Sequence, residues 1–340
     1  NAARIGGLVG EQASGVHIAN SYATGVVSGD NYIGGLIGVN GGAVSKSYAT
    51  GNVTSLNFVG GLVGINNGSI SEAFSSGDVL MTGNYAGGLV GQNSGSIANS
   101  YSSSRMTANG NWGGGLTGIN GGSIDKSYAM GPITGSLTGG LTAANSGSVT
   151  GSFWNTSTTG KATSAAGTGK TTAQRQASAS LFSGAGWDIS ADGATAAIWR
   201  IYEGSSSPLL TAFMKSVTIG VADVTYTYKG TAATLAEMCP SCDASLLNGA
   251  IAVAGGGINV GTYSMSSLGL TSTQMGYNIK TGSGHLVITP AALTMTANNA
   301  NKTYGQTVNF TGSEFTSSGL VNNETISSVS LASAGSGATA

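Results

Sequence analysis

The stretch Val59-Gly-Gly-Leu-Val-Gly-Ile-Asn-Asn-Gly-Ser-Ile70 decides the fold of this 340-residue chain, because its pattern returns at regular intervals. The phrase Gly-Gly-Leu occurs six times, with its leucine at Leu8, Leu36, Leu62, Leu89, Leu116 and Leu141. The apolar pieces of each unit are too short for helices, and Gly, Asn or Ser interrupts them every few residues. A unit of this kind cannot bury an apolar face alone and must stack on its neighbours. The sequence therefore predicts an all-β chain with a β-solenoid of about six coils over residues 1–152.

Equivalent positions of successive units have compatible chemistry. One column is apolar throughout and contains Val27, Val53, Val79, Met106 and Ile133. A second apolar column contains Val16, Val44, Ile70, Ile97, Ile124 and Val149. Asp78 and Arg105 fall on adjacent units of another column, where residues about 4.8 Å apart would attract. These two columns and the leucines predict in-register coils with three inward-facing strands per turn.

The composition excludes several functional classes. Twelve Lys and Arg and 13 Asp and Glu give a net charge of -1 and only 7% charged residues, so the chain has no electrostatic footprint for nucleic acid. No apolar run is long enough to span a bilayer. Glycine takes 58 positions but has no three-residue period, which excludes collagen. Because there is no leader and the chain ends within a Gly, Ser and Ala stretch, we expect a piece of a longer protein.

An aromatic ladder is the candidate binding site. It consists of Tyr22, Tyr48, Phe74, Tyr101, Tyr128 and Phe153. Strand alternation around Val53 places these rings on the outer face of the coil, where they could stack on sugar rings or on another protein. Two alternatives stay open: a glycine bulge returns the rings to the core, or another segment covers them. A second aromatic column, Tyr32, Phe58, Tyr85 and Trp112, shares the parity of the inward leucines and is predicted to lie in the core.

The repeat ends near residue 152, and three further regions follow. Residues 153–213 hold three of the four tryptophans and are predicted to form a cap over the end of the solenoid. One short helix is expected within residues 171–181. Residues 214–290 alternate apolar and polar positions in short strands, which predicts a small β-sandwich-like, Ig-like module. Residues 291–340 are predicted to begin a second, truncated module of the same type.

These patterns resemble two known families. The Gly-Gly-Leu-x-Gly units, followed by Ser-Tyr-Ala-Thr-Gly at 47–51, resemble the GLUG repeat, and the cap resembles the segment that commonly follows it. The stretch from Leu286 to Ala297, with Lys302-Thr-Tyr-Gly305, is similar to the bacterial Ig-like modules called MBG. Both families occur in large exoproteins that resemble filamentous haemagglutinin. The resemblance implies a right-handed parallel β-helix, export by two-partner secretion through an outer-membrane partner, and a biofilm adhesin at the bacterial cell surface.

The remaining chemistry is sparse. Cys239-Pro-Ser-Cys242 is the one cysteine pair, and in an exported protein it is expected to be a local disulfide. The rod's acids, Glu11, Asp30, Glu72, Asp78 and Asp125, place no two carboxylates in one column on adjacent coils, so neither an enzyme nor a metal site is predicted. No cofactor is expected. The predicted function is attachment, with an exopolysaccharide or another cell-surface molecule as partner. The alternatives are a passive spacer and, third, a polysaccharide-active β-helix enzyme.

Overall fold

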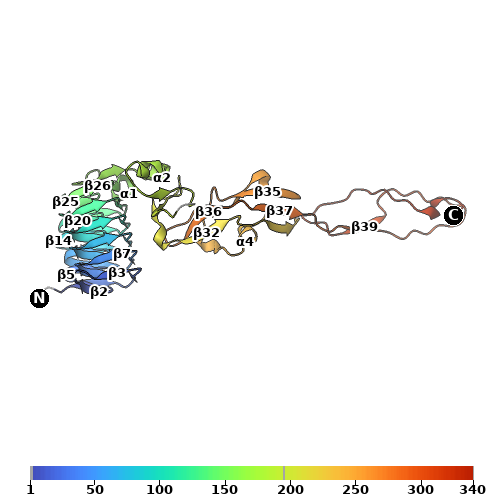
Figure 1. The fold of residues 1–340 in the computed structure, drawn as a ribbon. Helices are drawn as coiled ribbons and strands as arrows, with labels where there is room; N and C mark the ends of the chain where they lie inside the picture. Colours follow the sequence, from blue (N-terminus) through green and yellow to red (C-terminus); the bar gives the residue numbers. More distant parts are fainter. Residues whose placement is uncertain (1–2, 194–195, 340) are drawn as a thin grey trace. The chain divides into compact units, whose positions relative to one another are not determined.

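A computed structural model describes residues 3–193 and 196–339 of the chain. The chain packs into two compact units, Asn1–Ser216 with Thr271–Asn278, and Val217–Leu270 with Ile279–Ala340. The first unit contains a parallel β-solenoid, the rod, whose strands stack from blue at β2 to green at β26 (Figure 1). The predicted all-β solenoid of about six turns is confirmed, because two of its sheets each contain six parallel strands, one per coil.

Four sheets run along the rod. The first contains β1 (Ile5–Gly6), β5 (Val27–Gly34), β9 (Val53–Gly60), β13 (Val79–Met81), β14 (Asn84–Gly87), β18 (Met106–Ala108), β19 (Asn111–Gly114), β23 (Ile133–Gly135) and β24 (Thr138–Gly139). The second contains β2 (Val9–Gln12), β6 (Ile37–Asn40), β10 (Val63–Asn66), β15 (Val90–Asn93), β20 (Thr117–Asn120) and β25 (Thr142–Asn145). The third contains β3 (His17–Ala19), β7 (Ala43–Ser45), β11 (Ser69–Ser71), β16 (Ser96–Ala98), β21 (Ser123–Asp125) and β26 (Ser148–Thr150). The fourth contains β4 (Tyr22–Ala23), β8 (Tyr48–Ala49), β12 (Phe74–Ser75), β17 (Tyr101–Ser102), β22 (Tyr128–Ala129), β27 (Phe153–Asn155) and β28 (Thr168–Lys170).

The prediction of three strands per turn was therefore wrong. The fourth sheet was missed because its strands are two or three residues long, and its inward residues are small, such as Ala23 and Ala49. Small residues at these positions form no column of large apolar side chains, which is the signal that the prediction counted. The prediction was also wrong about Val16, because Ile18 is the residue that pairs with Val44. Val16 is exposed at the start of the rod.

The glycines of the repeat make the bend between the first two sheets. A Cβ atom on Gly34 would lie 2.0 Å from the Ile37 carbonyl oxygen, and one on Gly35 would lie 2.1 Å from that of Gly61. Neither contact is possible for a real side chain, so only glycine lets the chain turn this tightly against the next coil. Leu36 then points inward and is fully buried. The Gly-Gly-Leu phrase is thus a bend that delivers a leucine to the core.

The core of the rod forms two apolar clusters. One contains five members of the leucine column with Val44, Ile70, Ile97 and Ile124, and the other contains the Val27 column with Ile33, Val59 and Met81. The prediction of an inward leucine was wrong at Leu8, which is 49% exposed on the first coil. The backbone amides of Leu36 and Leu62 each donate to the next coil's leucine carbonyl at 2.9 Å. Stacking therefore pairs backbone groups between coils while apolar columns exclude water.

The cap follows directly on the rod. Its elements are α1 (Thr156–Thr159), α2 (Thr172–Ala177), α3 (Ser180–Ser183), β29 (Ile189–Ser190), β30 (Trp199–Arg200), β31 (Leu209–Leu210) and the 3-10 turn η1 (Thr211–Phe213). The expected single helix within 171–181 is divided in two. The side chain of Thr171 caps α2 together with Gln174, in a reciprocal capping box, and the backbone returns to an extended conformation at Ser178 before α3 begins.

The region after the cap contains a small mixed sheet. Its order is β33 (Val224–Thr227), β37 (His285–Thr289), β35 (Gly261–Ser266) and β34 (Ala252–Val253). Its remaining elements are β32 (Lys215–Ile219), α4 (Leu235–Met238), η2 (Ala244–Leu246), η3 (Ala254–Gly256) and β36 (Tyr277–Thr281), and β32 pairs with β36. The final segment has one antiparallel pair, β38 (Thr294–Ala297) with β39 (Phe315–Ser318), and the turn η4 (Ala334–Ser336). The Ig-like sandwich is only weakly indicated by these few strands.

Candidate functional site

The predicted aromatic ladder is a continuous stack along the fourth sheet. Successive ring centroids from Tyr22 to Tyr128 lie 5.1, 4.9, 5.2 and 4.9 Å apart, and the ring planes are within 7° of parallel. Phe153 pairs with Tyr128 in register at the end of the ladder. The rings point away from the interior of the coil, as strand alternation predicted.

The cap covers most of this ladder. Phe213 packs edge-on against Tyr48 and Phe74, with ring centroids 5.5 and 5.0 Å apart. Trp199 packs against Tyr101 and Tyr128, with ring centroids 6.3 and 5.8 Å apart. The ladder therefore matches the alternative in which another segment covers the rings.

Polar contacts fix the cap in this position. The Tyr128 hydroxyl donates to the Pro208 carbonyl at 2.5 Å, and the Trp199 indole donates to the Asn99 side-chain oxygen at 3.3 Å. The Arg175 guanidinium lies 4.3 Å from the centre of the Tyr128 ring, a cation–π contact. Burial raises the pKa of Tyr128, so its hydroxyl stays protonated as a donor.

Little of the ladder remains for a ligand. Phe74, Tyr101, Tyr128 and Phe153 are each at most 5% exposed, whereas Tyr22 is 60% exposed. Tyr48 is half-buried. Because the covered rings pack against the cap, only Tyr22 and the half-buried Tyr48 of the ladder are accessible.

The second aromatic column lies on the surface, so its assignment to the core was wrong. Tyr32, Phe58 and Tyr85 are half-buried, and Trp112 is 37% exposed. All four have left-handed backbone, with φ between 51° and 67°. Parity counted from Leu36 fails here, because neither a left-handed residue nor the Gly34-Gly35 bend preserves strand alternation. The neighbouring Ile33 is the residue that enters the core.

An asparagine ladder runs beside this column. The Asn57 amide donates to the Asn31 side-chain oxygen at 3.0 Å, the Asn84 amide donates to Asn57 at 3.2 Å, and the Asn111 amide donates to Asn84 at 3.0 Å. Asn111 is exposed and the other three are half-buried. We define the outer strip as this asparagine ladder together with the column Tyr32, Phe58, Tyr85 and Trp112.

A second asparagine ladder lies inside the rod. Its members are Asn40, Asn66, Asn93, Asn120 and Asn145, and the amide nitrogen of each of the first four donates to the next side-chain oxygen at 2.7 Å. The first four are fully buried. The sequence signal for both asparagine ladders was the recurrence of Asn at one place in each unit, and neither was predicted.

The rod's acids mostly have cationic neighbours. Glu11 pairs with Arg4, and Asp78 lies 4.0 Å from Arg105 on the next coil. Burial opposes ionisation of Asp125, but hydrogen bonds from Lys126 and Thr150 lower its pKa overall. Among residues 3–193 and 196–339, no three His, Cys, Asp or Glu side chains gather where they could hold a metal ion.

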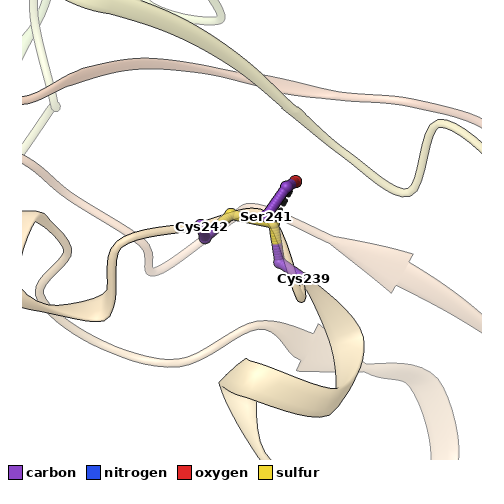
Figure 2. The surroundings of a disulfide bond; sticks show 3 residues. All are labelled: Cys239, Ser241 and Cys242. Atoms are coloured by element: carbon purple, nitrogen blue, oxygen red, sulfur yellow. Dashed lines mark hydrogen bonds between the residues drawn. A yellow bond between two sulfur atoms is a disulfide. The ribbon is translucent and has the colours of Figure 1, made fainter.

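Cys239 and Cys242 are joined by a disulfide at the end of α4 (Figure 2). The Thr234 side chain caps this helix with Glu237, and Lys229 donates to Glu237 at 2.6 Å. The Lys229 ammonium, followed by the Thr234 backbone, lowers the pKa of Glu237 to about 2. The disulfide thus closes a short turn beside a capped helix.

Two stretches of the rod match a known family model. The model is described as the GLUG motif, and it matches residues 29–54 and 82–107. The rod carries GLUG motifs. Each match is about one coil long and includes the left-handed aromatic position and the Gly-Gly-Leu bend, so the motif coincides with a structural coil. No curated protein and no solved structure matches the chain.

Repeats of this kind in a β-solenoid fit an extended surface protein such as an adhesin. In the part of the chain that the structure describes, helices are all too short or too polar to cross a membrane.

Proposed function

We propose that this chain is an attachment segment of a secreted bacterial surface protein, which binds an exopolysaccharide or another cell-surface molecule and catalyses no reaction. The observation that carries the proposal is the rod itself, in which coils with GLUG motifs stack in register along four parallel sheets. A stack of this kind can extend by adding coils, because each coil contacts only its neighbours. The rod then supplies reach between the cell and its target.

Pairing of the rod's charges supports binding rather than catalysis. Hydrolysis of a glycosidic bond needs two carboxylates facing one substrate. Instead, Glu11 and Asp78 each face an arginine, and Asp125 faces Lys126 and Thr150. The lowered pKa of Asp125 makes that carboxyl a poor general acid, because its proton is lost at low pH.

The wider assignment rests on the resemblance. A role in biofilm, export by two-partner secretion and a position at the cell surface follow from the similarity of the rod to GLUG-containing exoproteins and of residues 286–305 to MBG modules. The Cys239–Cys242 disulfide is consistent with an oxidising compartment outside the cytoplasm. A passive spacer is the second candidate, favoured by the cap, which covers most of the predicted ladder.

Adhesion of coated beads separates these two candidates. Beads carrying the chain at fixed density are mixed with biofilm-forming bacteria and with their extracted matrix. Retention of the coated beads above that of beads with an unrelated protein supports attachment. A matched control carries Leu89→Asp, which places a charge in the fully buried leucine column and disrupts the coil. Equal retention of folded chain and control would leave the spacer as the function.

A further inference from the structure

The outer strip combines three half-buried aromatic rings and the 37% exposed Trp112 with regularly spaced polar groups. Its rings repeat at the spacing of the coils: Tyr32 to Phe58 is 5.1 Å and Phe58 to Tyr85 is 4.9 Å between centroids. In the described part of the chain, no ring of the cap contacts this column. The rings of the cap therefore leave the strip uncovered, and its side chains are half-buried except for the exposed Asn111 and Trp112.

The backbone at these rings is unusual. Four successive coils place an aromatic residue in the left-handed conformation, which residues other than glycine and asparagine adopt rarely. Glycine would satisfy the same backbone without strain. Contact of Phe58 with Tyr32 and with Tyr85 offsets part of this strain, and Trp112 is left 37% exposed.

The strip also offers unused hydrogen-bonding capacity on each coil. An asparagine amide has two N–H donors and a carbonyl oxygen with two lone pairs. The ladder uses one donor of Asn57, Asn84 and Asn111, and the Asn57 oxygen accepts from both the backbone and the side chain of Asn84, so the second N–H donor of each amide is left. Within the described residues, neither the Tyr32 nor the Tyr85 hydroxyl has a hydrogen-bond partner. Each of the four coils therefore presents one aromatic side chain and one asparagine amide side by side.

Charge is nearly absent from this surface. The column that precedes the asparagines reads Asp30, Leu56, Gly83 and Gly110, and only its first member is charged. The outward positions at the start of the same sheet hold Ser28, Thr54, Leu80 and Thr107. An uncharged surface of aromatic rings and amides suits a neutral polysaccharide, which offers hydroxyl groups and C–H groups, better than an acidic polymer.

We propose that the outer strip binds one extended chain of a neutral polysaccharide, running parallel to the rod with about one sugar per coil. This inference rests on the proposed function, since it names the ligand class of the attachment. The dimensions favour a polysaccharide over a protein partner. Four coils about 4.8 Å apart give a strip roughly 20 Å long and only two residue columns wide, which is narrow for the about 800 Å² per partner that a stable protein interface buries.

Trp112 provides a direct reporter of binding at the strip. The other three tryptophans, Trp154, Trp187 and Trp199, are at most 6% exposed, whereas Trp112 is 37% exposed. The probes are dextran, mannan, galactan and cellohexaose, with anionic alginate for comparison. We expect one neutral probe to bind, to shift Trp112 emission to shorter wavelength and to protect it from acrylamide quenching, and we expect Trp112→Phe to lose that signal.

A double variant tests the residues of the strip. Tyr85→Gly with Trp112→Gly removes two rings while the backbone keeps its positive φ, and affinity should fall roughly tenfold or more. The matched control is Lys46→Gly with Glu72→Gly, which changes two left-handed positions on another corner of the coil without changing the net charge. This control should bind like the parent. Melting curves of both variants confirm that each is folded.

Three results would overturn the inference: no neutral probe binds at about 1 mM, alginate alone binds, or the strip variant binds as well as its control. Self-association of the chain that the strip variant abolishes would show instead that the strip contacts a second copy. The same variants on beads separate the two proposals. If beads carrying the strip variant still adhere, the attachment function stands and its ligand binds elsewhere on the chain. If beads carrying the unchanged chain do not adhere, the attachment function itself is contradicted.

Discussion

Replacing Asn93 by aspartate tests the buried asparagine ladder with almost no change in side-chain volume. The Asn93 amide nitrogen donates to the Asn120 side-chain oxygen at 2.7 Å, the Ser123 carbonyl at 3.2 Å and the Gly95 carbonyl at 3.3 Å. All three partners are acceptors. In Asn93→Asp a carboxylate oxygen takes the place of the donor, so attraction becomes repulsion at a fully buried site.

The expected loss can be worked from these contacts. A buried hydrogen bond contributes about 1 kcal/mol net, and an uncompensated buried charge costs about 3–5 kcal/mol. We expect Asn93→Asp to lower the free energy of unfolding by about 4 kcal/mol. For a unit of this size, 1 kcal/mol shifts the melting temperature by about 2–4 °C, so Tm should fall by about 8–16 °C.

Thermal unfolding of the chain followed by circular dichroism at neutral pH measures this shift. Asn111→Asp is the matched control, because its ladder is at the surface, and it should stay within about 0.5 kcal/mol of the parent. Burial raises the pKa of the introduced carboxyl in the folded state, so the deficit should shrink as pH falls and the carboxyl regains a proton to donate. Equal melting of the two variants, or a deficit of Asn93→Asp that does not change with pH, would refute the reasoning.

Three further predictions concern the core, the cap and the second unit. Leu89→Ala should lower the free energy of unfolding of the rod by about 3 kcal/mol, measured by denaturant unfolding, because Leu89 is fully buried. The control Leu137→Ala, at a half-exposed position, should change the free energy of unfolding by about 0.5 kcal/mol at most. Tyr128→Phe removes the buried bond to the Pro208 carbonyl, so limited proteolysis should cut the cap sooner, at a loss of about 1–2 kcal/mol. The pKa of Glu237 is lowered from 4.5 to about 2, so its stabilising effect is present above pH 4.5 and is lost as pH falls toward 2; Glu237→Gln should remove this dependence from an acid titration of the second unit.

The repeat could be recognised in the sequence because equivalent positions of successive coils need the same type of residue. A bend that only glycine can make, followed by a leucine that must be buried, has to recur once per coil, and Leu36, Leu62 and Leu89 therefore appear at regular spacing. Adjacent Asp78 and Arg105 indicated the register in the same way, and the structure places them on neighbouring coils. The all-β solenoid and its register were thus predictable from spacing and residue type.

The facing of the two aromatic columns was not predictable in this way. Parity along a strand is a local rule, and it failed at Tyr32 because a left-handed residue and the Gly34-Gly35 bend separate it from Leu36. Whether the other column is covered depends on Trp199 and Phe213, which lie between 71 and 165 residues along the chain from the rings that they cover. No periodicity within the repeat carries that information.

The sequence by itself determined the coil, its inward leucines and its stacking register, because these follow from contacts that repeat between equivalent residues of neighbouring units. The tertiary structure alone decided which aromatic column the cap covers. That outcome depends on where a non-repeating cap packs and on backbone dihedral angles at single corners, and neither is encoded in the pattern of apolar and polar residues.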